Sequence, residues 1–181
     1  MTAPIENRSL RSRAAILNAF AGLLFRDGFE NVSVQSIVAG AGIARSTFYE
    51  HFSSKDDVLR ASMAQFLEVF ASCLGGDDHV PELARVLDHF WDNRRLVDPI
   101  FTGSARRIVA LSLSEMIESQ LRRSSESLLL PPRLAAIHLA EAQLALVENW
   151  LRGRAFASVD DMATALCQTS RASARALRRA D

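Results

Sequence analysis

The sequence predicts an all-α protein of about nine helices, with an N-terminal helix-turn-helix domain and a larger C-terminal helical domain. Gly and Pro, which interrupt helices, number only 8 and 5 among 181 residues. β-branched residues are few beside the many Ala, Leu and Arg, which favour helices. Apolar residues make up 49% of the chain, enough for a buried core. We expect residues 1–53 to form the first domain and residues 54–181 the second.

The first helix is expected from about Ser9 to Asp27, after a disordered segment at residues 1–8. Gly28 follows as the residue that ends it. Its buried stripe consists of Ile16, Leu17, Phe20, Leu23 and Leu24. Six of the 13 aromatic residues lie within the first 52 positions: Phe20, Phe25, Phe29, Phe48, Tyr49 and Phe52. Because three short helices need bulky anchors to form a core, we expect all of these except Tyr49 to be buried.

The segment from Ser33 to Lys55 predicts two short helices joined by a tight turn. Ser33 is placed to cap the first of them, and Val34, Ile37 and Val38 share one face of it. Gly40-Ala41-Gly42 supplies the backbone freedom for a sharp turn. The second helix, about Arg45 to His51, directs Phe48 and Phe52 to one side. This is the layout of a helix-turn-helix, in which the second helix enters the DNA major groove.

The same segment resembles the TetR family of bacterial transcriptional regulators. The matching residues are Ser33, Ile37-Val38, Ala41-Gly42-Ile43-Ala44, Tyr49-Glu50-His51-Phe52 and Lys55. Two positions depart from the family pattern. Ala44 stands where the family usually has Ser, so the recognition helix lacks a side-chain cap, and Gly40 weakens the end of the preceding helix.

Candidate DNA contacts follow from the residue types and from this resemblance. Arg45 can pair with guanine in the major groove, and Thr47 can meet a thymine methyl group or a phosphate. The resemblance implies that Tyr49, His51 and Lys55 hold phosphates. The complete predicted set is Arg11, Ser33, Arg45, Ser46, Thr47, Tyr49, His51 and Lys55.

The overall charge gives no sign of nucleic-acid binding, because 21 basic residues balance 21 acidic ones. Binding to DNA must therefore come from the local placement of charge. Arg8, Arg11 and Arg13 form a basic arm directly before the helix-turn-helix, which suits phosphate contacts. The alternative for these three residues is an ordinary solvated start of a helix.

Further helices are expected along the rest of the chain, interrupted by short breaks. Ser54 and Asp57 have the spacing of a capping box at the start of the next helix. Breaks are expected at Gly75–Asp78, Pro99–Gly103 and Ser124–Pro132. The helices themselves are expected at about 54–74, 81–93, 105–124, 133–152 and from Ser158 or Asp160 to 178.

The last two helices carry the prediction of a homodimer. One stripe of the helix at 133–152 consists of Leu134, Ile137, Ala140, Leu144, Val147 and Leu151, and a second of Leu139, Ala142, Leu146 and Trp150. The final helix carries an Ala-rich stripe of Met162, Ala163, Leu166, Ser170, Ala174 and Leu177. A helix that is apolar on two sides is buried on two sides. The resemblance favours a four-helix interface between two subunits over packing within one chain alone.

The C-terminal domain is also predicted to enclose an apolar or mixed pocket for a small-molecule effector, which the resemblance implies. Its expected lining is Phe66, Phe70, Phe90, Trp91, Phe101, Leu111 and Met116. His89 and Asn93, or His138 and Gln143, are candidates for polar contacts. The competing interpretation is that these side chains are simply core.

Cys73 and Cys167 each lie on an apolar helical stripe and are expected to be reduced core thiols in a cytoplasmic protein, with a redox switch as the alternative. No nucleophile elbow, phosphate loop or metal-spaced His/Cys cluster occurs, so neither an enzyme, a cofactor nor a metal is predicted. The resulting prediction is a dimeric TetR-type regulator that represses from a palindromic operator until a ligand releases it. The alternative is a helical small-molecule-binding module without transcriptional control.

Overall fold

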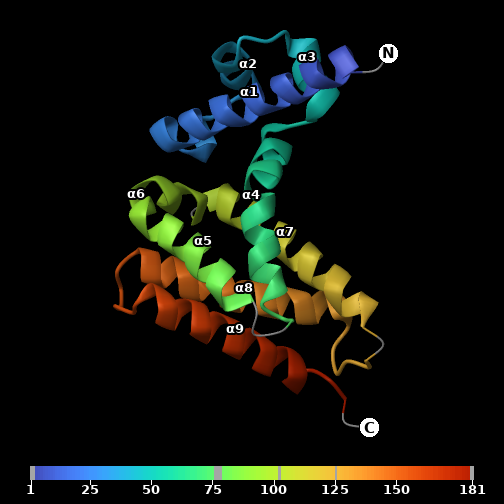
Figure 1. Ribbon diagram of the computed structural model, residues 1–181, viewed down its shortest axis with the longest axis vertical. Helices are drawn as coiled ribbons and strands as arrows, with labels where there is room; N and C mark the ends of the chain where they lie inside the picture. Colours follow the sequence, from blue (N-terminus) through green and yellow to red (C-terminus); the bar gives the residue numbers. More distant parts are fainter. Residues whose placement is uncertain (1–2, 76–78, 102, 125, 180–181) are drawn as a thin grey trace. The chain divides into compact units, whose positions relative to one another are not determined.

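The computed structural model describes residues 3–75, 79–101, 103–124 and 126–179, and within these ranges the regular secondary structure is helical, apart from one isolated bridge between Leu128 and Arg178 (Figure 1). The predicted all-α class is confirmed. The elements are α1 Ala3–Asp27, η1 Phe29–Asn31, α2 Val34–Ala41, α3 Arg45–His51, α4 Lys55–Ser72, α5 Val80–Asp92, α6 Arg94–Val97, η3 Asp98–Phe101, α7 Gly103–Arg123, α8 Pro132–Leu151 and α9 Val159–Ala176.

The chain divides into two compact units. Unit 1 comprises residues 1–63 and 99–108, and unit 2 comprises residues 64–98 and 109–181. The division falls inside α4 and inside α7, whereas the sequence suggested a boundary at the N-terminal end of α4. The first turns of both helices therefore belong to the unit that contains α1, α2 and α3.

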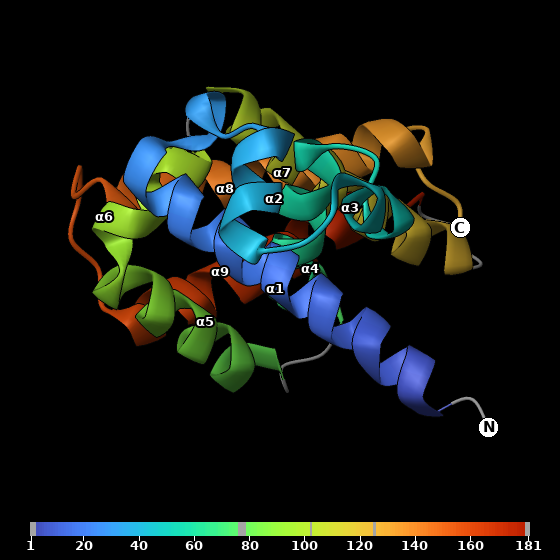
Figure 2. The ribbon, with the colours of Figure 1, turned by 90° about the horizontal axis from the view of Figure 1, so that it is seen from above.

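Unit 1 is built on α1, with α2 and α3 lying against one side of it (Figures 1 and 2). Its core holds Ile16, Phe20, Phe29, Ile37 and Phe48, all at most 3% exposed. Phe20 and Phe29 meet edge to face, with ring centroids 6.3 Å apart. The predicted aromatic anchors thus form the core, as expected for such a small domain.

Two predictions for the first helix were wrong. The helix begins at Ala3, so residues 3–8 are helical and not disordered; Pro4 does not interrupt it because proline is tolerated in a first turn. Phe25 is 41% exposed and does not join the core. At 3.6 residues per turn, Phe25 lies about 140° around the helix from Phe20, outside the buried stripe.

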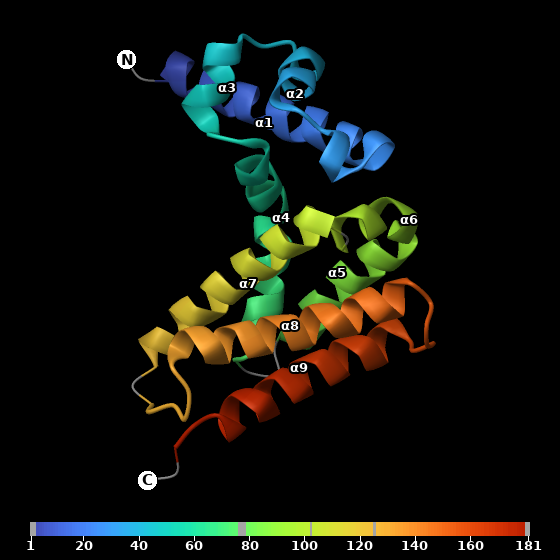
Figure 3. The same ribbon diagram turned by 180° about the vertical axis from the view of Figure 1, so that it is seen from behind.

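Unit 2 contains α5, α8, α9 and the remaining parts of α4 and α7. The helices α8 and α9 run side by side (Figure 3), and α5 packs against α9. The stacked rings of Trp91 and Trp150, 4.7 Å apart, join α5 to α8. The core includes Leu67, Phe70, Leu83, Leu87, Leu113, Ile117 and Leu139.

The predicted breaks are only partly described. Residues 76–78 of the Gly75–Asp78 break and residue 125 of the serine-rich break lie outside the described residues. The expected irregular segment at Pro99–Gly103 is partly helical, because η3 runs from Asp98 to Phe101. Among the described helices, none combines the length and apolar character needed to cross a lipid bilayer.

Candidate nucleic-acid interface

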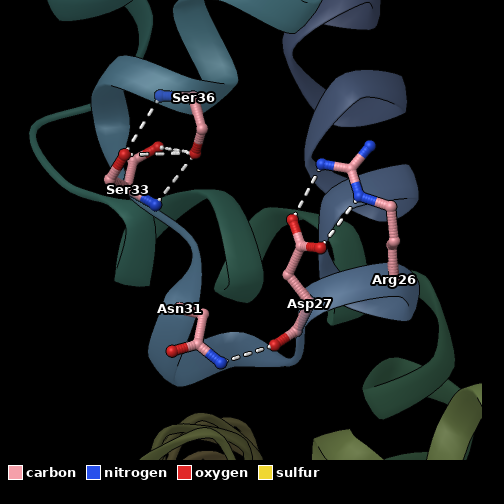
Figure 4. Close-up of polar contacts among 5 residues, drawn as sticks. All are labelled: Arg26, Asp27, Asn31, Ser33 and Ser36. Atoms are coloured by element: carbon pink, nitrogen blue, oxygen red, sulfur yellow. Dashed lines mark hydrogen bonds and ion pairs between the residues drawn. The ribbon is translucent and has the colours of Figure 1, made fainter.

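The start of α2 is fixed by two serine side chains. The Oγ atom of Ser33 accepts a hydrogen bond from the backbone N–H of Ser36 at 3.1 Å, and the Oγ atom of Ser36 accepts one from the N–H of Ser33 at 3.0 Å (Figure 4). This reciprocal capping box satisfies two backbone donors that the helix leaves without partners. The predicted cap is confirmed. Ser36 therefore engages both the N–H and the Oγ atom of Ser33. A phosphate that binds the Ser33 hydroxyl or N–H would share that group with Ser36.

The turn between α2 and α3 depends on one glycine. Gly42 has φ 63° and ψ 35°, a left-handed conformation that costs little only without a Cβ atom. The next residues return to extended backbone, and Ala44 precedes α3 without a side-chain cap, as predicted. The N-terminal N–H groups of α3 therefore receive no capping side chain from residue 44, which leaves them suited to an anion.

The helix α3 has one buried face and one polar face. Phe48 is fully buried and Phe52 is 7% exposed, so these two rings attach the helix to the core of unit 1. Arg45, Ser46 and Tyr49 are exposed, whereas Thr47 and His51 are half-buried. The predicted division of α3 into an aromatic inner face and a polar outer face is thus observed.

Arg45 and Tyr49 form a pair one helical turn apart on this outer face. An Nη atom of Arg45 donates a hydrogen bond to the Tyr49 hydroxyl at 3.1 Å, and the guanidinium carbon lies 5.6 Å from the ring centroid. A guanidinium carries five N–H donors, so this bond leaves others for a base edge. These two contacts with Tyr49 restrict the conformations of the Arg45 side chain, whereas an exposed arginine without contacts samples many rotamers.

Lys55 has a different environment from the one predicted. Its Nζ atom lies 2.8 Å from the carbonyl oxygen of Phe29, 2.9 Å from that of Val32 and 3.3 Å from that of Glu30. It also lies 4.5 Å from the centroid of the Phe29 ring. An ammonium group has three protons, and three carbonyl oxygens surround this one. In this arrangement Lys55 ties the first turn of α4 to η1, and a phosphate would have to compete with the chain's own backbone.

The first turn of α4 is also capped. The Oγ atom of Ser54 accepts a hydrogen bond from the N–H of Asp57 at 3.2 Å, which confirms the predicted role of this pair. The Asp57 carboxylate accepts from the backbone N–H of Ser53 and from the Ser54 hydroxyl, both at 3.1 Å. The side chain of Asp57 therefore holds the chain leaving α3, whereas Lys55 ties the same turn of α4 to η1.

A junction between η1 and α7 was not foreseen from the sequence. The Oε1 atom of Glu30 accepts hydrogen bonds from the Ser104 hydroxyl at 2.7 Å and from the Ser104 backbone N–H at 3.0 Å. These bonds, the hydroxyl bond first, lower the pKa of Glu30 against the opposing effect of desolvation. A Cβ atom on Gly103 would lie 2.9 Å from Oε1 and displace this carboxylate, and the φ of 53° at Gly103 favours glycine. A separation of 74 residues left no local sequence signal for this contact.

Positive charge is concentrated in unit 1. This unit contains nine Arg and Lys residues against six Asp and Glu residues, so its formal charge is +3 and that of unit 2 is −3. Arg8, Arg11 and Arg13 are all exposed on α1. Arg13 also lies over the ring of Phe52, 5.5 Å from its centroid, so it packs as well as carrying charge. Although the whole chain is neutral, its excess positive charge therefore lies in the unit that contains α3.

The residues predicted to line an effector pocket have different environments among the described residues. Phe70 and Phe90 are buried core residues with stacked rings 6.3 Å apart, and Trp91 stacks on Trp150. Leu111 is exposed on α7, and Met116 is half-buried there. Phe101 belongs to unit 1, where it is 3% exposed. Phe70, Phe90 and Trp91 thus take part in packing, and their role in binding an effector stays a prediction.

A cleft of about 650 Å³ lies instead between α4 and α5. Phe66 belongs to it and stacks on His89, with ring centroids 5.8 Å apart and planes 8° from parallel. The lining combines apolar and ionisable side chains: Gln65, Phe66, Glu68, Val69, Ser72, His79, Glu82, Arg85, Val86 and His89. Helical spacing groups Glu82, Arg85 and His89 on one side of α5, a signal that a search for aromatic residues alone passes over.

The two C-terminal helices differ in how they use their apolar residues. The predicted stripe on α9 is turned inward, since Met162, Ala163, Leu166, Ser170 and Ala174 are all buried. On α8, by contrast, Leu134, Ile137 and Leu146 are 54%, 38% and 39% exposed. The unpartnered apolar surface of this pair therefore belongs mainly to α8.

The polar face of α3, the turn at Gly42 and the charge of unit 1 define a DNA-binding protein of the helix-turn-helix class. Residues 16–62 match the family model described as bacterial regulatory proteins, tetR family. This segment begins in α1 and ends in α4, so it includes the whole of the proposed interface except the basic arm. The helix-turn-helix segment is therefore that of the TetR family of transcriptional regulators, and the rest of the chain is similar to members of that family.

Similar proteins extend over nearly the whole chain. The HTH-type transcriptional regulator AcrR of Shigella flexneri is 27% identical over 179 aligned residues, which cover 83% of each protein. A TetR transcriptional regulator from Streptococcus agalactiae has a TM-score of 0.60 at 21% identity, over 94% of this chain and 99% of that one. NalD of Pseudomonas aeruginosa, the secondary repressor of the MexAB-OprM multidrug efflux pump, has a TM-score of 0.51 at 24% identity, over 95% and 98%. At these identities the solved structures establish the shared fold.

Proposed function

We propose that this protein is a transcriptional repressor that binds a two-fold symmetric DNA operator as a homodimer and loses affinity when a small molecule binds to unit 2. The observation that carries the proposal is the ordered Arg45–Tyr49 pair on the outer face of a short helix. Phe48 and Phe52 fix the opposite face of this helix in the core. A rigid helix with an outward arginine is what direct reading of the major groove requires.

The polar residues of α3 other than Glu50 each have a proposed task on the duplex. Arg45 donates to the O6 and N7 atoms of a guanine, and Ser46 and Thr47 contact the neighbouring base or phosphate. Tyr49 and His51 hold phosphates on either side of the groove. At the N-terminus of α2, Ser33 presents a helix end that favours a phosphate, and Arg11 on α1 contacts the backbone. Lys55 supports this surface through η1 and does not bind DNA directly in the proposed complex.

The homodimer is proposed to form through α8, with α9 beside it. Leu134 and Ile137 are large apolar side chains three residues apart on one side of α8, and Leu146 lies on another side of the helix; the described residues leave all three at least 38% exposed. Burying Leu134 and Ile137 against a second copy gives a C2 interface, because the same helix supplies both sides. Two recognition helices then read half-sites one DNA turn, about 34–36 Å, apart.

The effector is proposed to bind in the cleft between α4 and α5. Its mixed lining suits an aromatic or apolar molecule that also carries a polar group, with Phe66 and His89 as a stacking surface. Family resemblance supports a ligand: FadR of Thermus thermophilus, which has the same fold with a TM-score of 0.51 at 16% identity over 87% of this chain and 92% of that one, is a repressor solved in complex with lauroyl-CoA. Lys55 in the first turn of α4 binds the Phe29 carbonyl of η1. A ligand that moves this helix therefore also moves a contact that stabilises the DNA-binding unit.

The proposal is tested by selecting bound sequences from a random pool of duplex DNA. We expect enrichment of a palindrome whose half-sites are one helical turn apart, and sedimentation of the complex with an even number of chains per duplex. A control with Ile137→Glu, which places a charge on the exposed face of α8, should bind the same duplex weakly while keeping its helical content. No enrichment from the pool, with an effector bound in the α4–α5 cleft, would favour the ligand-binding module without transcriptional control.

A further inference from the structure

Two cysteines that are far apart in the sequence meet in unit 2. Cys73 follows the last turn of α4, and Cys167 lies in the middle of α9. Their sulfur atoms are 2.7 Å apart, with the Cys167 thiol donating to the Cys73 sulfur. Both side chains are fully buried. The sequence left open whether these thiols are unrelated core residues or a redox pair, and their contact is the first observation that separates the two.

Polar groups connect the same helices about one helical turn away from the two thiols. The carboxamide of Gln143 on α8 donates to the Phe70 carbonyl at 3.2 Å and to the Ser170 hydroxyl at 2.8 Å. Phe70 and Ser170 lie one helical turn from Cys73 and Cys167, so Gln143 joins the same two helices as the thiols do. Its Oε1 atom is buried and accepts no hydrogen bond from any described residue. A polar acceptor and two thiols thus share the interface of α4, α8 and α9.

We propose that Cys73 and Cys167 are an oxidative modification site, at which a hydroperoxide converts the two thiols into an intrachain disulfide that joins the end of α4 to α9. A small polar oxidant suits the site because the thiols are enclosed and their neighbourhood offers hydrogen-bonding groups. Large disulfide reagents have no path to two fully buried sulfur atoms.

The reaction takes place in two balanced steps. The sulfur of one cysteine attacks a peroxide oxygen, an S–O bond forms, the O–O bond breaks, and one water or alcohol leaves with the thiol proton. The sulfur of the other cysteine then attacks the resulting sulfenic acid, the S–S bond forms, and the hydroxyl group leaves as water with the second thiol proton. Two electrons pass from the two thiols to one hydroperoxide.

Burial sets the speed of this modification. The pKa of Cys73 is raised by its hydrogen bond with Cys167 and by desolvation, against a smaller opposing effect of Arg171. The reactive thiolate is therefore scarce, and the first step waits for a local opening that admits the oxidant. The second step is fast because the partner sulfur is already in contact. A sulfenic acid at either position is consequently captured before it is oxidised further.

The product constrains α4. The cross-link closes a loop between positions 94 residues apart, which reduces the freedom of the unfolded chain. The same bond attaches the C-terminal end of α4 to α9. Oxidised protein should therefore resist unfolding more than reduced protein does.

The test uses the full-length protein and hydrogen peroxide, with the remaining thiols alkylated after denaturation and the intact mass measured. We expect the number of alkylatable thiols to fall from two to zero, with loss of two hydrogen atoms from a single chain and full reversal by dithiothreitol. The urea midpoint of the oxidised protein should be higher than that of the reduced protein. Cys73→Ala lacks the second thiol needed for a disulfide. In this variant Cys167 should instead accumulate a sulfenic acid that dimedone traps.

Three results would overturn the proposal. One is survival of both thiols in samples whose methionines are already oxidised. Another is addition of oxygen to one cysteine of the wild-type protein without linkage to the other. The third is a disulfide between two chains in place of one within the chain. None of these readouts depends on DNA or on an effector, so the proposed regulatory function can fail while this site stands, and the reverse.

Discussion

Replacing Lys55 by methionine tests the assignment of this residue to folding. The substitution keeps most of the apolar stem and removes an ammonium group that three backbone carbonyls surround at 2.8–3.3 Å. A hydrogen bond to a charged group contributes about 1.5–3 kcal/mol. The Phe29 carbonyl keeps a second donor, the Val32 N–H at 3.2 Å, when the ammonium group is removed. Because the site is half-exposed, water replaces part of what is lost. We therefore expect Lys55→Met to lower the free energy of unfolding of unit 1 by about 2 kcal/mol.

The two units allow this loss to be located. Both tryptophans, Trp91 and Trp150, lie in unit 2, so tryptophan fluorescence follows that unit, whereas far-ultraviolet circular dichroism follows the helices of both. In urea, Lys55→Met should shift an early part of the dichroism transition to lower concentration and change the fluorescence transition much less. Arg11→Met, which removes a cation from an exposed position, should stay within about 0.5 kcal/mol of the wild type.

A second readout separates folding from DNA contact. Arg11→Met should reduce the dependence of DNA affinity on salt, since one phosphate contact accounts for a slope of about 0.9 in log K against log salt. If Lys55→Met gave this same reduction with unchanged urea transitions, the ammonium would serve a phosphate and its assignment to folding would be wrong.

Three further predictions concern unit 1. Ser36→Ala should destabilise it by about 1 kcal/mol in urea, because the Ser33 N–H loses the Ser36 Oγ atom as its acceptor, whereas the bond from the backbone N–H of residue 36 to Ser33 remains. Gly42→Ala should cost about 1 kcal/mol because of the left-handed turn, whereas Gly22→Ala, in a helix with open space around it, should stabilise by about 0.5–1 kcal/mol. Glu30 has a lowered pKa in the folded protein, so its contribution is present above the unfolded pKa of about 4.3 and is lost as the pH falls through the folded value. Glu30→Gln should therefore be less stable than the wild type at pH 6, and the difference should shrink below about pH 4 in unfolding curves measured at each pH.

Local patterns in the sequence predicted the structure of the helix-turn-helix segment well. The bounds of α3, the cap at Ser33, the missing cap at Ala44 and the burial of Phe48 all follow from interactions within a few residues. Propensity, capping and helical periodicity act over this range, and they agree with one another here. A short motif of this kind is therefore readable without knowledge of the rest of the chain.

Contacts between distant residues were missed for the same reason. The carbonyl cage around Lys55 and the bonds from Ser104 to Glu30 depend on how elements far apart in the sequence come together. Likewise, the aromatic residues predicted to line a pocket include Phe70 and Phe90, whose buried rings stack on each other. Apolar periodicity marks what is buried, but it does not distinguish the wall of a cavity from solid packing.

The affinity of Arg45→Ala for the selected duplex, compared with that of Arg26→Ala, tests the DNA-reading role of α3 most directly. Both changes remove one arginine from the surface of unit 1, but Arg26 lies at the C-terminal end of α1 and pairs with Asp27 at 2.8 Å (Figure 4). With two half-sites and about 1–3 kcal/mol for each guanine contact, Arg45→Ala should weaken binding by at least about 30-fold and leave the urea transitions unchanged. Arg26→Ala should bind nearly as well as the wild type. Equal affinities for the two variants would mean that this helix does not read the DNA.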